Sequence, residues 1–200
     1  MKNLLFLLLV VTFLSCNNSK NLENIHDNAV SENDIYEIVN LVLTESENAI
    51  KSHGLNESPY KYLIDKDLDS LFNNRDITEI KCIDSAFAKN DFEFIDKQIE
   101  NRKDFRFKKS LLKIKSLDII SADTIQKMIL EGSKSQSESF YSLYFKKYKK
   151  WYYTIGLPVF SKDKKTVFVK FNSFRSGQTL VYKKVNNRWK YFCSGGYWVA

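Results

Sequence analysis

The spacing of apolar side chains changes from the period of helices to the period of strands partway along the chain. Over residues 32–51, apolar side chains recur every three or four positions, which predicts a helix. Ser31 is suited to cap the first turn of this helix, and Gly54 is suited to end the helix. The same spacing predicts three shorter helices, over residues 58–74, 91–99 and 122–130.

The last fifty residues instead alternate apolar and polar side chains in short runs separated by turn residues. This pattern predicts strands at residues 151–157, 166–174, 179–185 and 189–193, with an earlier strand over 111–119. Because asparagine tolerates positive φ, Asn186-Asn187 suits a two-residue hairpin. Helices come first and strands follow, so the sequence predicts an α+β fold, with N-terminal helices packed on a C-terminal antiparallel β-meander.

The first fifteen residues have the three parts of an export signal: a positive start, an apolar run and a small residue, Ser15. The apolar run is shorter than the roughly 20 residues that a membrane-spanning helix needs. Phe13-Leu14-Ser15-Cys16 resembles the lipobox of bacterial lipoproteins, which are cleaved before the cysteine and acylated on it, although leucine is commoner at the position of Phe13. The resemblance implies lipidation of Cys16. The alternatives are an ordinary secretory signal cut nearby and an uncleaved anchor.

Three segments follow from this interpretation. Residues 1–15 are the lipoprotein signal peptide, residues 16–30 form a polar, flexible tether, and residues 31–200 form a single globular α+β domain. The formal net charge of +7 favours anionic partners, among them lipid headgroups, anionic glycans and acidic proteins. Nucleic acid is excluded as a partner because an exported protein rarely meets it and no recognised binding motif is present.

Two cysteines remain once Cys16 is assigned to the lipid. A disulfide between Cys82 and Cys193 would close a loop of more than a hundred residues, for which the chain-entropy model suggests on the order of 4 kcal/mol of stabilisation. The alternative is two separate buried thiols. Spacing along the chain does not decide between them.

Residues 140–153, here called the lysine–aromatic segment, mix aromatic side chains with four lysines. Such a segment could stack on sugar rings or lie at an anionic headgroup surface. The alternative, which we favour, is that Phe140, Tyr144, Tyr148 and Tyr152 pack on the core at helical spacing while the lysines are solvated. The candidate surface-binding residues are Lys146, Lys147, Lys149, Lys150 and Trp151.

The acidic run that begins at Asp65 partly matches a calcium loop, with Asp67, Asp69 and Asp76 at the third, fifth and twelfth positions. Ser70 stands at the sixth position, where such a loop needs glycine, so exposed helix acids are the better interpretation. His26 and His53 have no neighbouring nucleophile, and no hydrolase, phosphate-loop or dinucleotide motif is present. The sequence therefore predicts no metal, no cofactor and no catalytic residue.

Several C-terminal motifs occur together. They are Pro158-Val159-Phe160-Ser161-Lys162-Asp163, which fits a PxFSxD turn, the YKKxNxxWK hairpin of residues 182–190, and the terminal Tyr197-Trp198. Together these motifs resemble small uncharacterised lipoproteins of the Bacteroidetes type. The resemblance spans roughly the C-terminal half of the chain. It implies folding signals and no particular activity.

The expected function is therefore that of a cell-envelope lipoprotein, anchored to a membrane through its lipid and facing the periplasm or placed at the outer membrane. Its domain would be a non-catalytic binding module for an envelope protein or a glycan, with any concave face lined by residues 168–191. The alternative is an NTF2-like ligand-binding domain or small hydrolase, which a deep pocket containing a carboxylate would favour. A structural stress lipoprotein with no specific ligand is a third hypothesis.

Overall fold

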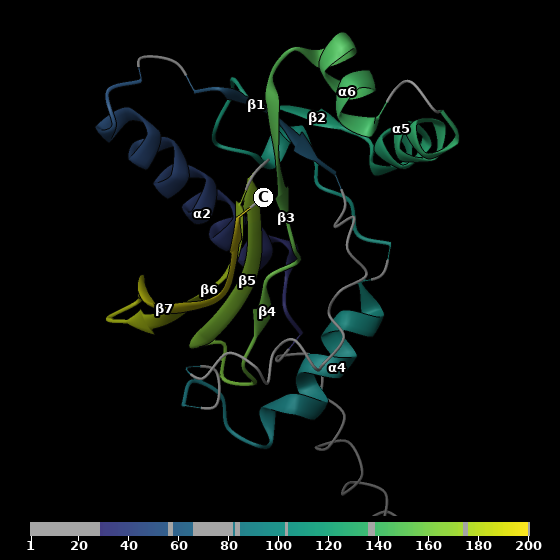
Figure 1. The fold of residues 1–200 in the computed structure, drawn as a ribbon. Coiled ribbons are helices and arrows are strands. Elements are labelled where there is room, and N and C mark those ends of the chain that lie inside the picture. The colour runs from purple at the N-terminus through teal and green to yellow at the C-terminus, as the bar shows by residue number, and fades with distance from the viewer. Residues whose placement is uncertain are drawn as a thin grey trace, which may run out of the picture. The chain divides into compact units, whose positions relative to one another are not determined.

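A computed structural model describes residues 29–55, 58–65, 82, 85–102, 104–135, 139–173 and 176–199. Among these residues, helices and one mixed sheet form an α+β unit over residues 31–200 (Figure 1). The predicted fold class is confirmed, because the helices largely precede a C-terminal strand meander. None of the described helices has both the length and the apolar composition needed to cross a membrane.

The first described helix, α2 (Glu32–Ser52), agrees closely with its prediction. Ser31 and Asp34 form a reciprocal capping box, in which each side chain accepts a hydrogen bond from the backbone of the other residue. Gly54 follows the helix with φ of +81°, a conformation that other residues rarely adopt. One stripe of α2 is buried: Ile35, Tyr36, Ile38, Val39, Asn40, Val42 and Leu43.

The sheet has the strand order β2-β1-β3-β5-β6-β7, and β4 pairs with part of β5. Strands β3, β5, β6 and β7 form an antiparallel meander, as predicted, whereas β1 pairs in parallel with both β2 and β3. The strands are β1 (Tyr60–Ile64), β2 (Asp118–Ile120), β3 (Trp151–Ile155), β4 (Val159–Phe160), β5 (Thr166–Ser173), β6 (Ser176–Val185) and β7 (Arg188–Val199).

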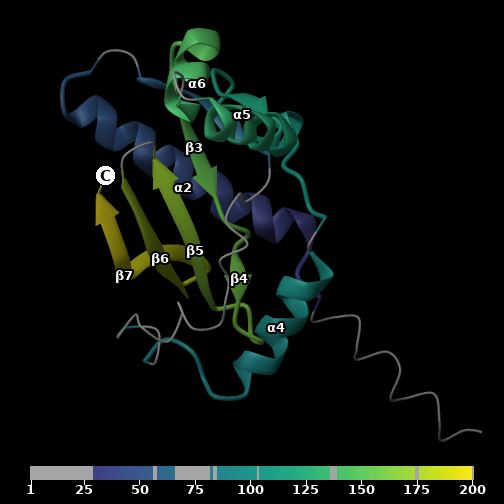
Figure 2. The ribbon, with the colours of Figure 1, turned by 45° about the vertical axis from the view of Figure 1, so that its right-hand side comes forward.

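Helix α2 lies across one face of this sheet (Figures 1 and 2). Two tyrosines on that face reach the helix: Tyr182 donates to Glu45, and Tyr153 accepts from Ser46. Asn40, on the buried stripe, donates to the carbonyl of Leu111 and accepts from the amide of Lys113. The helix is thus fixed to the sheet and also to the segment that precedes β2.

The remaining helices cover the other face of the sheet. Helix α4 (Asp91–Asn101) contributes Ile95 to a core cluster with Phe168 and Val181. Helices α5 (Ala122–Lys134) and α6 (Phe140–Tyr148) pack around Ile64 and Ile120 in a second cluster. In Figure 2, α4 lies at the lower end of the sheet and α5 and α6 at the upper end.

At β4, the side-chain amide of Gln98 makes the hydrogen bonds that a neighbouring strand would otherwise make. Gln98 of α4 donates to the carbonyl of Phe160 at 2.7 Å and accepts from the amide of Phe160 at 3.0 Å. Arg102 donates to the carbonyl of Pro158, and Asp91 accepts from the amide of Lys162. On the edge of β4 away from β5, the backbone groups of the PxFSxD segment are therefore satisfied by side chains of α4 and its C-cap, as buried polar groups require.

Two predicted elements are wrong. The helix expected from residue 58 begins instead with the strand β1, and residues 66–74 lie outside the described residues. The strand expected over 111–119 is reduced to β2, preceded by the 3₁₀ turn η1 (Lys109–Leu111). Leu63, Ile64, Leu112 and Leu117 are buried, as their apolar character indicated, but parallel pairing with distant strands gives residues 60–64 a strand conformation. Helix α5 also extends past its predicted end at residue 130.

Candidate functional site

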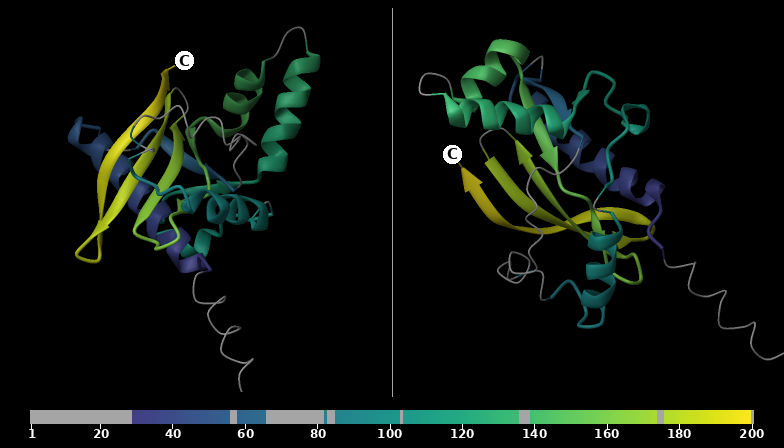
Figure 3. Two further views of the ribbon diagram at one scale, coloured as in Figure 1. Left: turned by 90° about the horizontal axis from the view of Figure 1, so that it is seen from below. Right: turned by 90° about the vertical axis from the view of Figure 1, so that its right-hand side faces the viewer.

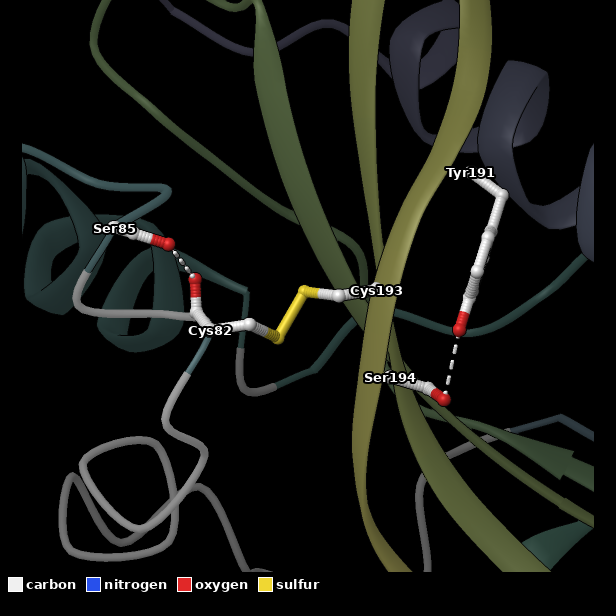
Figure 4. The surroundings of a disulfide bond; sticks show 5 residues. All are labelled: Cys82, Ser85, Tyr191, Cys193 and Ser194. Atoms are coloured by element: carbon white, nitrogen blue, oxygen red, sulfur yellow. Dashed lines mark hydrogen bonds between the residues drawn. A yellow bond between two sulfur atoms is a disulfide. The ribbon is translucent and has the colours of Figure 1, made fainter.

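A disulfide joins Cys82 to Cys193, two cysteines for which the sequence left a bridge and two separate thiols open (Figure 4). Their Cα atoms are 6.5 Å apart and 111 positions separate them along the chain. Both cysteines pack against the core cluster that contains Ile95 and Phe168. The bond thus fastens the approach to α4 to the last strand. Cys16, the predicted lipidation site, lies outside the described residues.

The aromatic side chains of the lysine–aromatic segment belong to the core. Tyr144 is fully buried in α6, and its ring lies 4.9 Å from that of Tyr148 and 5.0 Å from that of Tyr152. Phe140 packs against the same cluster. This arrangement confirms the interpretation in which the aromatic stripe packs inward.

The four lysines of this segment, Lys146, Lys147, Lys149 and Lys150, are exposed around the end of α6. Lys149 caps the helix with φ of 56°. Trp151 is half-buried at the start of β3, and its ring lies 4.3 Å from that of Phe145. Whether the lysines bind a partner stays a prediction, because their exposure is equally that of solvated charges.

A second group of cations is brought together by the sheet. The turn before β5 (residues 162–165) and the β6–β7 hairpin (residues 183–190) are neighbours, since the amide of Lys184 donates to the carbonyl of Lys165 at 2.7 Å. Together the two segments hold seven basic side chains and one carboxylate, that of Asp163. We call these cations the basic end: Lys162, Lys164, Lys165, Lys183, Lys184, Arg188 and Lys190.

The tight turns of the basic end follow from local residue preferences. Asn186 and Asn187 have φ of 50° and 57°, as the sequence predicted for a two-residue hairpin. Ser161 and Asp163 hold the other turn, because the Ser161 hydroxyl donates to Asp163 and accepts from the amide of Thr166. The turn before β5 and the strand ends beside the hairpin turn therefore hold their cations on ordered backbone.

Aromatic rings lie under two of these cations. The ammonium of Lys183 is 4.0 Å from the ring centre of Phe192, and that of Lys184 is 5.0 Å from the ring centre of Trp189. Phe192 is 44% exposed, so part of this aromatic surface faces solvent. The basic end is thus a mixed cationic and aromatic surface rather than a row of lysines alone.

Two cations of the basic end pair with the first turns of α2. Lys164 lies 3.7 Å from Asp34, and Lys184 lies 3.7 Å from Glu37. Burial alone would raise the pKa of Asp34, but the hydrogen bonds from Ser31 and the two nearby ammonium groups outweigh it and hold this pKa below its ordinary value. The start of the domain and the basic end are therefore adjacent (Figure 3).

A second polar cluster lies between α2 and the sheet. Tyr182 donates to Glu45 at 2.7 Å, and Tyr153 donates to Glu47 at 3.3 Å, while Tyr60 stacks on Tyr153. Burial, with the Glu45 carboxylate, raises the pKa of Tyr182. Both buried tyrosines thus remain protonated donors, which suits them to hold the helix in place.

The most buried carboxylates have structural partners. Asp65 accepts from Arg106 and, at 2.7 Å, from the amide of Ala122 at the start of α5. Asp91 accepts from the amides of Ala88 and Lys162. His53 is exposed at the end of α2. Of the calcium-loop residues, Asp65 is engaged in this way and residues 66–76 lie outside the described residues. Within the described part of the chain no group of metal-ligating side chains is found.

Among the described residues, three buried side-chain atoms have no hydrogen-bond partner, and the sequence does not indicate them: the Oδ1 of Asn172, the hydroxyl of Tyr144 and the indole Nε1 of Trp189. Asn172 of β5 donates to Thr154 of β3 at 3.0 Å, but its Oδ1 accepts nothing. The hydroxyl of Tyr144 is likewise unpartnered. Such groups are rare in native proteins because each carries a desolvation cost that no bond offsets.

Comparison with protein-family models finds no family that matches the chain, and comparisons with curated proteins and with solved structures also find no match.

Proposed function

We propose that this protein is a lipoprotein of the cell envelope, anchored through Cys16, whose domain is a non-catalytic binding module for an envelope protein or glycan. The anchor rests on the lipobox-like sequence before Cys16. The Cys82–Cys193 disulfide supports export, because disulfides form and persist in oxidising compartments.

The binding role is carried by one observation, the form of β7. This twelve-residue strand ends the strand order of the sheet, so one of its edges lacks a partner within the described sheet. Tyr191, Phe192 and Tyr197 on this strand are 55%, 44% and 68% exposed. Exposed aromatic side chains beside an open strand edge favour association, both by strand addition and by stacking.

The anchor is tested by the intact mass of the protein purified from bacterial membranes. We expect the mass of residues 16–200 plus acyl chains, and we expect a Cys16→Ala variant to keep residues 1–15 and carry no acyl chain. A wild-type protein that lacks the acyl mass would refute the anchor.

The binding role is tested by placing a photocrosslinking amino acid at Tyr197 in the anchored protein in cells. The matched control carries it at Tyr141, which is 51% exposed on α6, away from β7. A discrete crosslinked product from Tyr197 that Tyr141 does not give is expected. Equal or absent crosslinking from the two positions would contradict a binding role for β7.

A ligand-binding domain of the NTF2-like kind is a second candidate, and the unpartnered Oδ1 of Asn172 favours it. A small ligand with a hydrogen-bond donor would satisfy this atom, which the polar pair with Thr154 already orients. A thermal-shift screen of small polar compounds checks this candidate. A hit that persists in an Asn172→Ala variant would show that the compound binds elsewhere.

A further inference from the structure

The folded domain begins beside the basic end. Ser31 caps α2, and the carboxylates of the next turn and a half, Asp34 and Glu37, pair with Lys164 and Lys184. Figure 3 shows the turn before β5, the β6–β7 hairpin and the start of α2 at the same end of the sheet. Whatever holds the chain at its N-terminal side therefore holds it next to this cationic surface.

Four cations of the basic end project away from the protein. Lys162, Lys165, Arg188 and Lys190 are exposed. Within the part of the chain that the structure describes, none of the four makes an ion pair. By contrast, Lys164 and Lys184 are paired with α2, and Lys183 lies over the ring of Phe192. The carboxylates of Glu93 and Asp163 lie near enough to Lys162 and Lys165 to interact with them electrostatically, so the outward charge is only partly balanced.

The spacing between the anchor and the domain is short. Fourteen residues, 17–30, separate the lipidation site from the helix cap. Such a length of chain spans at most about 50 Å when extended, and about 20 Å on average as a flexible coil. An anchored domain would thus repeatedly bring its basic end within reach of the headgroups, where attraction acts over about 8 Å at physiological ionic strength.

We propose that the basic end docks on anionic lipid headgroups of the membrane that carries the anchor. This inference rests on the proposed function, because the lipid on Cys16 supplies the proximity. The cations lie on the turn before β5 and on the adjoining ends of β6 and β7, with Trp189 and Phe192 among them, a combination typical of surfaces that meet a headgroup layer. In this orientation Arg188, the first residue of β7, lies at the membrane, and the other end of the strand points away from the membrane.

The experiment uses the processed lipoprotein reconstituted into phosphatidylcholine vesicles, with and without phosphatidylglycerol. An amine-reactive reagent labels the lysines, and mass spectrometry gives the labelling rate of each. We expect Lys162, Lys165 and Lys190 to react several-fold more slowly on the anionic vesicles, and the protection to disappear as salt is raised. Lys146, Lys147, Lys149 and Lys150 in the same molecule are the internal control and should react equally on both vesicles.

A double variant, Arg188→Gln with Lys190→Gln, tests the electrostatic cause while Lys162 and Lys165 still report. Each neutralised cation weakens attraction to an anionic surface by about fivefold, so the pair should weaken docking by about 25-fold and remove the protection. The matched control, Lys146→Gln with Lys147→Gln, removes the same charge from α6 and should leave the protection intact.

Equal labelling of the basic end on both vesicles would overturn the inference. So would protection of Lys146 and its neighbours instead, or protection that arises only when an envelope protein is added. The intact mass reports the anchor separately. If no acyl chain is found, the proposed function fails, and the same labelling on the unanchored chain mixed with phosphatidylglycerol vesicles still decides whether the basic end binds anionic lipid.

Discussion

Replacing Tyr144 by phenylalanine should stabilise the protein. The side chain of Tyr144 is fully buried in the cluster formed by α5, α6 and the parallel strands, and its hydroxyl has no hydrogen-bond partner. Burial raises the pKa of this tyrosine, so the hydroxyl remains a neutral group that has lost water and gained nothing. Phenylalanine keeps the ring and its contacts with Tyr148 and Tyr152 while removing the unsatisfied atom.

The magnitude follows from two opposing contributions. An unsatisfied buried polar group costs about 1–3 kcal/mol, and the small void left by one oxygen atom costs a few tenths of a kcal/mol. We therefore expect the free energy of unfolding to rise by about 1 kcal/mol, which for a domain of this size corresponds to about 2–4 °C in Tm.

The assay is urea unfolding followed by circular dichroism, with the disulfide intact. Tyr182→Phe is the matched control, because its hydroxyl donates to Glu45 at 2.7 Å and its loss should destabilise by about 1–2 kcal/mol. If Tyr144→Phe instead lowers the free energy of unfolding by 1 kcal/mol or more, the hydroxyl has a partner and the reasoning is refuted.

Three further outcomes are expected. First, Asp34→Ala should lower the free energy of unfolding by about 1 kcal/mol at neutral pH, because the capping box is lost. Because the folded pKa of Asp34 lies below its ordinary value of 3.8, that contribution is complete above the unfolded pKa and is lost as the pH falls through the folded one. The urea midpoint of the variant should therefore lie below that of wild type at neutral pH and equal it at acid pH. An equally lowered midpoint at both pH values would contradict the linkage. Second, Cys82→Ser with Cys193→Ser should lower the free energy of unfolding by about 4–5 kcal/mol. Wild type under reducing conditions should behave alike, and an unchanged urea midpoint would argue against the bond. Third, Gln98→Met should lower the free energy of unfolding by about 2–3 kcal/mol, because it leaves the backbone amide and carbonyl of Phe160 without these hydrogen bonds. The exposed Glu93→Gln on the same helix serves as control, and equal effects of the two on the thermal midpoint would refute the role assigned to Gln98.

The parts of the fold that could be predicted from the sequence are those decided by near neighbours. The capping box and apolar stripe of α2 are local, and the Asn186-Asn187 hairpin depends on the φ preferences of two residues. Strand β1 was mistaken for a helix because its partners, β2 and β3, lie far along the chain. Parallel pairing over such separations has no local signature.

The candidate site was only partly visible for the same reason. Four lysines lie close together in the sequence around Lys146, so that segment was the candidate for surface binding. The basic end is assembled from residues 162–165 and 183–190, which the register of β5 on β6 makes neighbours, for example Thr166 with Lys183. In the sequence, the YKKxNxxWK motif indicates only a hairpin. The sequence does not indicate that the turn at residues 162–165 lies beside this hairpin.

The position of the disulfide has a consequence for how the chain matures. Synthesis runs from the N-terminus, so Cys82 emerges 111 residues before Cys193, and the only earlier thiol with which it could form an incorrect bond is Cys16. Acylation of Cys16 would remove that competitor, leaving a chain with only one intramolecular pairing. Lipid attachment would then act as a kinetic safeguard of oxidative folding as well as an anchor, and the order of the two modifications would decide the yield of native protein.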